Sequence, residues 1–267
     1  MSNNPFDPLT EETLNRVIRW MERSYILGLV SFLPKQIQEK IILVQEKIGT
    51  FFPATEDDVA ASTRKYIEIQ PGNAFHFTQL LLRFDRDGSR MPIRMSEIAK
   101  SKNDLLKAFG AIRQAVSEIK PFHVVLDKAF LIGTLIGVTG YCDDTVSVKS
   151  RHTLLSGLSK SLLDLCDLKP RILNITERGR QSDPEEFQEV HCTFGVVKRN
   201  PPLEFGKFKE AIYQMEFEPI SFVVDSVSLV HTRFLSYAPP QEGIVTFKLG
   251  EYLGKEEDEI LSSLRFV

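Results

Sequence analysis

The sequence contains few cysteines and no long apolar run. Its 267 residues include only Cys142, Cys166 and Cys192, and none of them forms a CxxC pair. Such sparse cysteines exclude a disulfide framework and a zinc knuckle, and they favour a reducing compartment. No segment approaches the roughly 20 apolar residues that span a bilayer, and the N-terminus does not resemble a secretory signal. We therefore expect a cytoplasmic protein with no membrane partner.

An excess of positive charge is also missing. The formal net charge is −3 at pH 7, so no global basic field attracts long nucleic acid, and we expect no DNA partner. A nucleotide or an RNA end needs only a local basic patch and stays compatible with this charge. The hydrophobic fraction of 42% and the charged fraction of 26% are those of an ordinary soluble globular protein.

Several well-known catalytic motifs are absent as well. The chain has no GxSxG elbow, no glycine-rich phosphate loop, and neither an HExxH nor an HxH pairing. Zinc sites use histidine, cysteine or carboxylate ligands in close sets, which this sequence does not offer. We therefore expect neither a metal nor another cofactor at the site.

Two short strings in apolar, strand-like runs stand out instead. They are His76–Thr78 and His191–Thr193, and each places a histidine two residues before a threonine. Residues i and i+2 of a strand share a face, so each string presents an imidazole beside a hydroxyl. If the two strands are neighbours, one pocket holds two imidazoles and two hydroxyls.

That set of groups suits the cleavage of a phosphodiester. One imidazole removes a proton from the attacking oxygen, and the other protonates the leaving oxygen. The hydroxyls of Thr78 and Thr193 can donate hydrogen bonds to the phosphoryl oxygens. Either histidine alone is better explained as a core residue, whereas the pair favours a catalytic function. The sequence leaves open which of His76 and His191 is the acid and which is the base.

These strings resemble the motifs of a known family. The tetrapeptides His76–Gln79 and His191–Phe194 resemble the two His-x-Thr-x motifs of the two-histidine phosphoesterase superfamily. This superfamily includes RNA 2′,3′-cyclic phosphodiesterases and 2′-5′ RNA ligase-like proteins. The segments Tyr25–Leu29, Pro121–Leu126 and Phe222–Leu229 look like the family's flanking strands. The chain departs from the family pattern at Gln79, where an apolar residue is common.

The resemblance implies a fold and an activity. The fold is α+β and two-lobed, a pseudo-twofold pair of antiparallel-sheet lobes with outer helices and a central cleft. Residues 25–267 are expected to form this domain. Residues 1–24 lie outside the resemblance and are expected to form an N-terminal helical extension. The activity is metal-independent hydrolysis of a cyclic phosphate or phosphodiester on a nucleotide or RNA end. His76 and His191 are the catalytic residues, and Thr78 and Thr193 bind the phosphate.

Further substrate contacts are expected from residues outside the motifs, namely Tyr25, Lys198, Arg199, His231 and Arg233. Two alternatives remain open for the function. A non-catalytic nucleotide- or RNA-binding module on the same fold does not need an acid–base pair. A metal-dependent hydrolase would lose its activity in EDTA.

Hydrophobic periodicity predicts the helices and strands. Helices are expected at Thr10–Arg23, Pro34–Ile48, Asn103–Ile119, Val148–Leu165 and Leu203–Met215. Strands are expected at Ser24–Phe32, Tyr66–Ile69, Ala74–Leu82, Pro121–Leu126, Phe130–Tyr141, Val190–Val197, Ile220–Leu235 and Gly243–Leu249.

Overall fold

A computed structural model describes most of the chain. The described residues are 25–51, 64–83, 102–166, 169–171, 189–199, 205–233 and 244–251. The helix expected at Thr10–Arg23, and with it the extension formed by residues 1–24, lies outside them. Within the described ranges, no helix is both long enough and apolar enough to cross a membrane.

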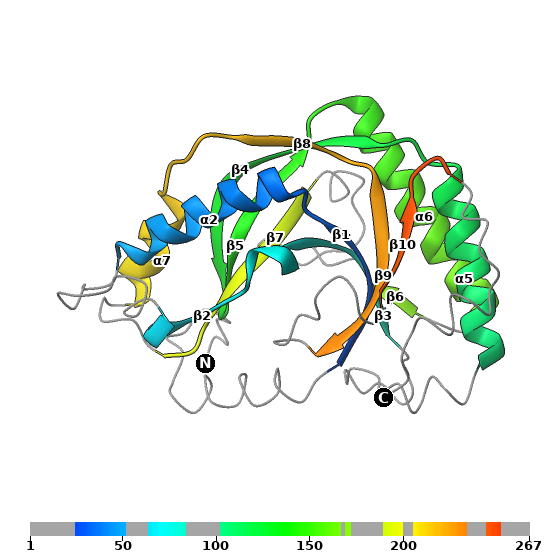
Figure 1. The fold of residues 1–267 in the computed structure, drawn as a ribbon, viewed down its shortest axis with the longest axis horizontal. Coiled ribbons are helices and arrows are strands. Elements are labelled where there is room, and N and C mark those ends of the chain that lie inside the picture. Colours follow the sequence, from blue (N-terminus) through cyan, green and yellow to red (C-terminus); the bar gives the residue numbers. More distant parts are fainter. Residues whose placement is uncertain are drawn as a thin grey trace, which may run out of the picture.

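The fold is α+β with two antiparallel sheets, as expected, and in the described residues each sheet has five strands (Figure 1). The first sheet has the strand order β10-β9-β1-β3-β6. Its strands are β1 (Tyr25–Phe32), β3 (His76–Arg83), β6 (Lys169–Arg171), β9 (Ser226–Arg233) and β10 (Ile244–Lys248). The second sheet has the order β2-β7-β5-β4-β8. Its strands are β2 (Ile67–Ile69), β4 (Phe122–Ile132), β5 (Leu135–Cys142), β7 (Glu189–Val197) and β8 (Ile220–Val224).

The two histidine motifs occupy equivalent places in the two sheets. The first lies on β3 and the second on β7. Each of these strands is second from one edge of its sheet, next to an edge strand of three residues, β6 or β2. The two sheets therefore present the motifs in a pseudo-twofold manner.

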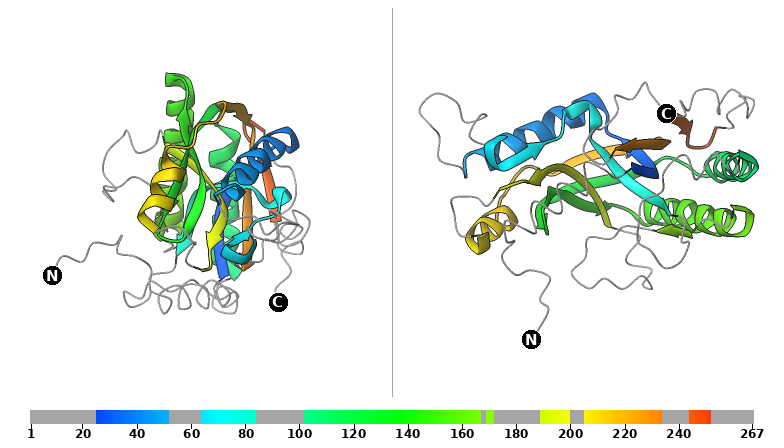
Figure 2. Two further views of the ribbon diagram at one scale, coloured as in Figure 1. Left: turned by 90° about the vertical axis from the view of Figure 1, so that its left-hand side faces the viewer. Right: turned by 90° about the horizontal axis from the view of Figure 1, so that it is seen from below.

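Helices flank the sheets on two sides. Helices α2 (Lys35–Gly49) and α7 (Phe205–Tyr213) lie beside the second sheet, and α5 (Lys102–Ser117) and α6 (Thr145–Cys166) lie side by side at the other end (Figures 1 and 2). Helix α6 begins after Asp144, whose carboxylate accepts hydrogen bonds from the backbone N–H and the hydroxyl of Ser147. This N-cap satisfies donors that the first turn of a helix leaves without a partner.

One hydrophobic core joins the two sheets. Phe77 of β3 stacks on Phe222 of β8 with ring centroids 5.4 Å apart. Phe75, just before β3, packs against Phe194 of β7 at 6.4 Å. Burial of aromatic side chains contributes strongly to stability, so these contacts hold the motif strands against the opposite sheet.

Two of the expected strands are each two strands in the structure. The run Phe130–Tyr141 contains a turn at Gly133, whose φ of 57° suits glycine and lets β4 fold back onto β5. The run Ile220–Leu235 breaks at Asp225, and its halves β8 and β9 belong to different sheets. In both runs the apolar pattern continues through the break, so periodicity alone did not separate the strands. The short strand β6 was not predicted.

Candidate functional site

The first motif lies on β3 with its residues on alternating faces. His76 and Thr78 are half-buried, whereas Phe77 and Gln79 are buried on the core side. This is the arrangement expected of a strand with a period of two residues. The imidazole and the hydroxyl of the motif therefore share one face, as predicted from their spacing.

The second motif repeats this arrangement on β7. Thr193 is half-buried, His191 retains 8% exposure, and Cys192 between them is fully buried. Burial raises the pKa of the Cys192 thiol to about 12, although the backbone N–H of His76 acts in the opposite direction. That influence of His76 on Cys192 places the second motif directly against the first.

Both motif strands carry a β-bulge at the same position of the motif. On β3 the register to β1 shifts from Leu80 to Thr78, so Gln79 is the extra residue. On β7 the register to β5 shifts from Gly195 to Thr193, so Phe194 is the extra residue. Bulges bend a strand and re-aim side chains, and they are frequent next to active sites. The fourth residue of each His-x-Thr-x motif is thus the extra residue of a β-bulge, and the alternation of side chains between the two faces of the strand ends there.

The ring of His76 is held by the backbone that precedes its strand. Its Nδ1 lies 2.8 Å from the carbonyl oxygen of Ala74, which also accepts a hydrogen bond of 2.9 Å from the Gln70 side chain. Because a carbonyl can only accept, Nδ1 carries a proton and the neutral ring keeps its lone pair on Nε2. Burial lowers the pKa of His76, and the bond to Ala74 opposes this shift.

The environment of the His191 ring disfavours its protonated form more strongly. Burial, then the positive charge of Arg151, then His76 lower the pKa of His191 to about 3. The effect of His76 on His191 indicates that the two imidazoles are close, since charge effects fade with distance. Phe130 of β4 meets the His191 ring edge-on, with centroids 6.2 Å apart. Burial therefore favours the neutral form of both rings in the free protein.

Polar residues on neighbouring strands extend the face that carries His191. Thr139 of β5 pairs directly with His191, and Lys128 of β4 pairs with Thr139. The Thr139 hydroxyl lies 2.9 Å from the carbonyl oxygen of Val190 and 3.3 Å from a carboxylate oxygen of Glu189. The other oxygen of the Glu189 carboxylate is buried and has no hydrogen-bond partner. Burial raises the pKa of Glu189, against the influence of Thr139, Arg151 and Lys128.

The structure places the other predicted substrate contacts at the end of β7 and on β1 and β9. Lys198 forms an ion pair of 2.9 Å with Glu68 of β2, and Arg199 is exposed beyond the end of β7. The other three lie on β1 and β9, where Arg233 pairs with Tyr25 and His231 with Leu27. Leu27 also pairs with Leu82 of β3, so His231, Leu27 and Leu82 lie side by side across the sheet. Leu82 is six residues from His76, which at about 3.3 Å per residue is roughly 20 Å along the strand.

Sequence reasoning missed Arg151, a buried cation that is hydrogen-bonded to both motif strands. It lies on α6 and is only 2% exposed. Its signal in the sequence is positional, because Ser147, Arg151, Leu154 and Leu158 follow helical spacing and all are buried. A charged residue on the apolar face of a helix requires buried partners.

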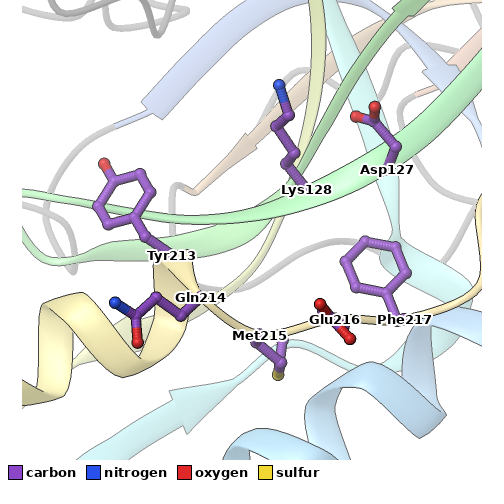
Figure 3. Close-up of a pocket in the computed structure, with 7 residues that line it drawn as sticks. All are labelled: Asp127, Lys128, Tyr213, Gln214, Met215, Glu216 and Phe217. Atoms are coloured by element: carbon purple, nitrogen blue, oxygen red, sulfur yellow. The ribbon is translucent and has the colours of Figure 1, made fainter.

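Figure 3 shows a groove of about 600 Å³ beside the edge of β4. It begins at Asp127, directly after the residues of β4 that pair with β8. It is lined by Asp127, Lys128, Tyr213, Gln214, Met215, Glu216 and Phe217. The groove contains none of the residues predicted for the site. In the described part of the chain, no three histidine, cysteine or acidic side chains are grouped as a metal site would require.

The fold and the site together define an α+β protein of two sheets with a histidine pair between them. Among solved structures, the chain is similar to E. coli LigT complexed with 3′-AMP, with 15% identity over 84% of this chain and 94% of that chain (TM-score 0.44). It is also similar to Kluyveromyces marxianus Usb1, with 13% identity over 86% and 99% (TM-score 0.44). A third is TT0787 of Thermus thermophilus, with 16% identity over 77% and 87% (TM-score 0.43).

These neighbours are members of the two-histidine phosphoesterase superfamily, which the two motifs of this chain resemble. No family model matches the sequence, and no curated protein matches it. At 13–16% identity and TM-scores below 0.5, the likeness assigns no activity to this chain.

Proposed function

We propose that this protein is a metal-independent phosphoesterase that cleaves a cyclic phosphate or phosphodiester on a nucleotide or an RNA end. The observation that carries the proposal is the meeting of two equivalent His-x-Thr motifs, each ended by a bulge, on strands of opposite sheets. A reaction at phosphorus needs one proton removed and one delivered, together with donors for the phosphoryl oxygens. His76, His191, Thr78 and Thr193 supply these groups.

The surroundings of the two rings favour different roles. The bond from His76 Nδ1 to the Ala74 carbonyl stabilises the protonated ring, so His76 suits the general acid. The charge of Arg151 disfavours a second cation nearby, so His191 suits the general base. An anionic phosphodiester bound between the rings raises the pKa of His76 further, because an opposite charge favours the protonated form.

In the proposed step, His191 removes a proton from water as the water oxygen bonds to phosphorus. The bond between phosphorus and the ribose oxygen breaks, and His76 Nε2 donates its proton to that oxygen. Thr78 and Thr193 donate hydrogen bonds to the two non-bridging oxygens as negative charge builds there. In this step His191 gains a proton and His76 loses one. Proton exchange with water then restores the starting protonation state of both rings.

We expect hydrolysis that is insensitive to EDTA. The panel is 2′,3′-cyclic AMP, an RNA with a 2′,3′-cyclic end and 2′-5′ oligoadenylate, each assayed with and without EDTA. Loss of cleavage in EDTA would support a metal-dependent hydrolase instead. Tight binding of a substrate without turnover would support a binding module on the same fold.

The pH dependence of kcat/KM should have an acidic optimum. The free protein is active when His76 is protonated and His191 is neutral. The rate is therefore greatest between the pKa of His191, about 3, and the pKa of His76, which burial lowers from its ordinary value. Above the pKa of His76, kcat/KM should fall about tenfold per pH unit. The measurement is kcat/KM for 2′,3′-cyclic AMP from pH 4.5 to 9. A rate that rises between pH 6 and 8 would contradict these protonation states.

A further inference from the structure

A buried arginine connects the two motif strands. Arg151 of α6 donates from Nε to the side-chain oxygen of Gln79 on β3 at 3.2 Å. It also donates from Nη1 to the carbonyl oxygen of Glu189 on β7 at 2.7 Å. We call Arg151 and these two acceptors the Arg151 bridge.

The bridge joins strands that share no backbone ladder. The strands β3 and β7 belong to different sheets and meet through side chains. Gln79 is the bulge residue directly after Thr78, and Glu189 lies two residues before His191 on the same face of β7. The guanidinium of Arg151 therefore binds one residue beside each motif.

The first-sheet end of the bridge continues into a chain of buried hydrogen bonds. The amide of Gln79 donates to the Ser31 hydroxyl at 3.0 Å, and this hydroxyl donates to the carbonyl oxygen of Ser226 at 2.8 Å. Gln79 and Ser31 are at most 2% exposed. A satisfied buried network of this kind is rigid, because breaking any bond in it leaves a polar group without a partner. The bridge thus ties β7 to β1 and β9 as well as to β3.

We propose that Arg151 is a positioning residue that sets the separation of the two motifs and places a positive charge beside His191. The catalytic part of this proposal rests on the proposed function. The planar fork of arginine reaches two acceptors in fixed directions, which the single ammonium of lysine cannot do. The charges that act on His191 are those of Arg151 on α6 and His76 on β3. Glu189 and Cys192 lie on the same strand as His191, and the charges of Arg151 and of Lys128 on β4 act on Glu189. Arg151 is the one whose charge lowers the pKa of His191 most.

The test separates charge from geometry with three variants. Arg151→Met removes the charge and the fork, and Arg151→Lys keeps the charge but loses the fork. Gln79→Met keeps Arg151 and removes its bond to β3, together with the bond from Gln79 to Ser31. Lys149→Met is the matched control, because Lys149 is exposed on the same helix. Histidine NMR titrations need no substrate, and kcat/KM on the panel above is measured alongside them.

In Arg151→Met we expect the titration of His191 to move up by about one pH unit, because a like charge has been removed. In Arg151→Lys and Gln79→Met the titration should stay near that of the wild type. In all three variants, kcat/KM should fall about 10- to 100-fold, since small displacements of catalytic groups are costly. Lys149→Met should change neither quantity.

A folded Arg151→Met protein whose His191 titrates as in the wild type would overturn the electrostatic part of the proposal. If that variant does not fold, unchanged kcat/KM in folded Arg151→Lys and Gln79→Met would overturn the positioning part. A wild-type protein that cleaves no member of the panel contradicts the proposed function, and the His191 titration then still decides whether the charge of Arg151 acts on this ring.

Discussion

Replacing either motif histidine by alanine should lower kcat/KM for an alkyl phosphodiester such as 2′,3′-cyclic AMP by about 10²- to 10⁴-fold. This range is the usual contribution of a positioned acid or base. We expect both variants to fold, with His191→Ala the less stable of the two, because His76 is half-buried whereas His191 is only 8% exposed. His123→Ala is the control. His123 is exposed on β4, and the bond from its backbone N–H to Ser147 survives the substitution. Thermal unfolding of the three variants shows whether a loss of activity reflects a loss of folded protein.

The same variants test the assignment of acid and base. A substrate whose leaving group is stable as an anion, such as a nucleoside 4-nitrophenyl phosphodiester, does not need a general acid. On that substrate His76→Ala should recover most of its lost activity relative to the wild type. His191→Ala should remain at least about 100-fold impaired, because water still needs a base. Recovery in His191→Ala rather than in His76→Ala would reverse the roles, and full activity of both variants on every substrate would remove the histidine pair from the mechanism.

The motif histidines could be predicted from the sequence because the information is local. A spacing of two residues in an apolar run places His76 beside Thr78 and His191 beside Thr193, whatever the rest of the fold does. That β3 and β7 meet depends on long-range pairing, and only the family resemblance indicated it. The equivalent bulges at Gln79 and Phe194 depend on the register with β1 and β5, which single-strand patterns do not contain.

Gln79 and Arg151 show what local patterns miss. Each is a polar residue on an apolar face, on a strand in one case and on a helix in the other. Taken alone, Gln79 looks like a departure from the motif and Arg151 like a charge on an ordinary helix. In the structure the two bind each other, so each explains the burial of the other. Partners so far apart in the chain can be matched only once the fold brings α6 against β3.

A substitution at Gly137 has the second large expected effect. Gly137 lies on β5, where it pairs with Phe130 on one side and Thr193 on the other. A Cβ at Gly137 would lie 2.2 Å from the carbonyl oxygen of Cys192 and 2.6 Å from the ring of Phe130. Both distances are far shorter than atoms tolerate, and the first involves backbone that cannot rotate away. The absence of a side chain therefore lets β7 approach β5 and lets Phe130 reach His191.

We expect Gly137→Ala to destabilise the protein by on the order of 2–3 kcal/mol, since an atom added to a packed interior forces the backbone to shift. The shift falls on Cys192 and Thr193, so kcat/KM should also fall by about tenfold or more. Urea denaturation gives the stability change from the midpoint at constant slope. The matched control is Gly157→Ala in the interior of α6, where a Cβ meets nothing within 4 Å. It should stabilise the protein by about 0.5–1 kcal/mol, because alanine favours a helix over glycine. If both variants are equally stable and active, the close approach of β5 and β7 does not position the second motif.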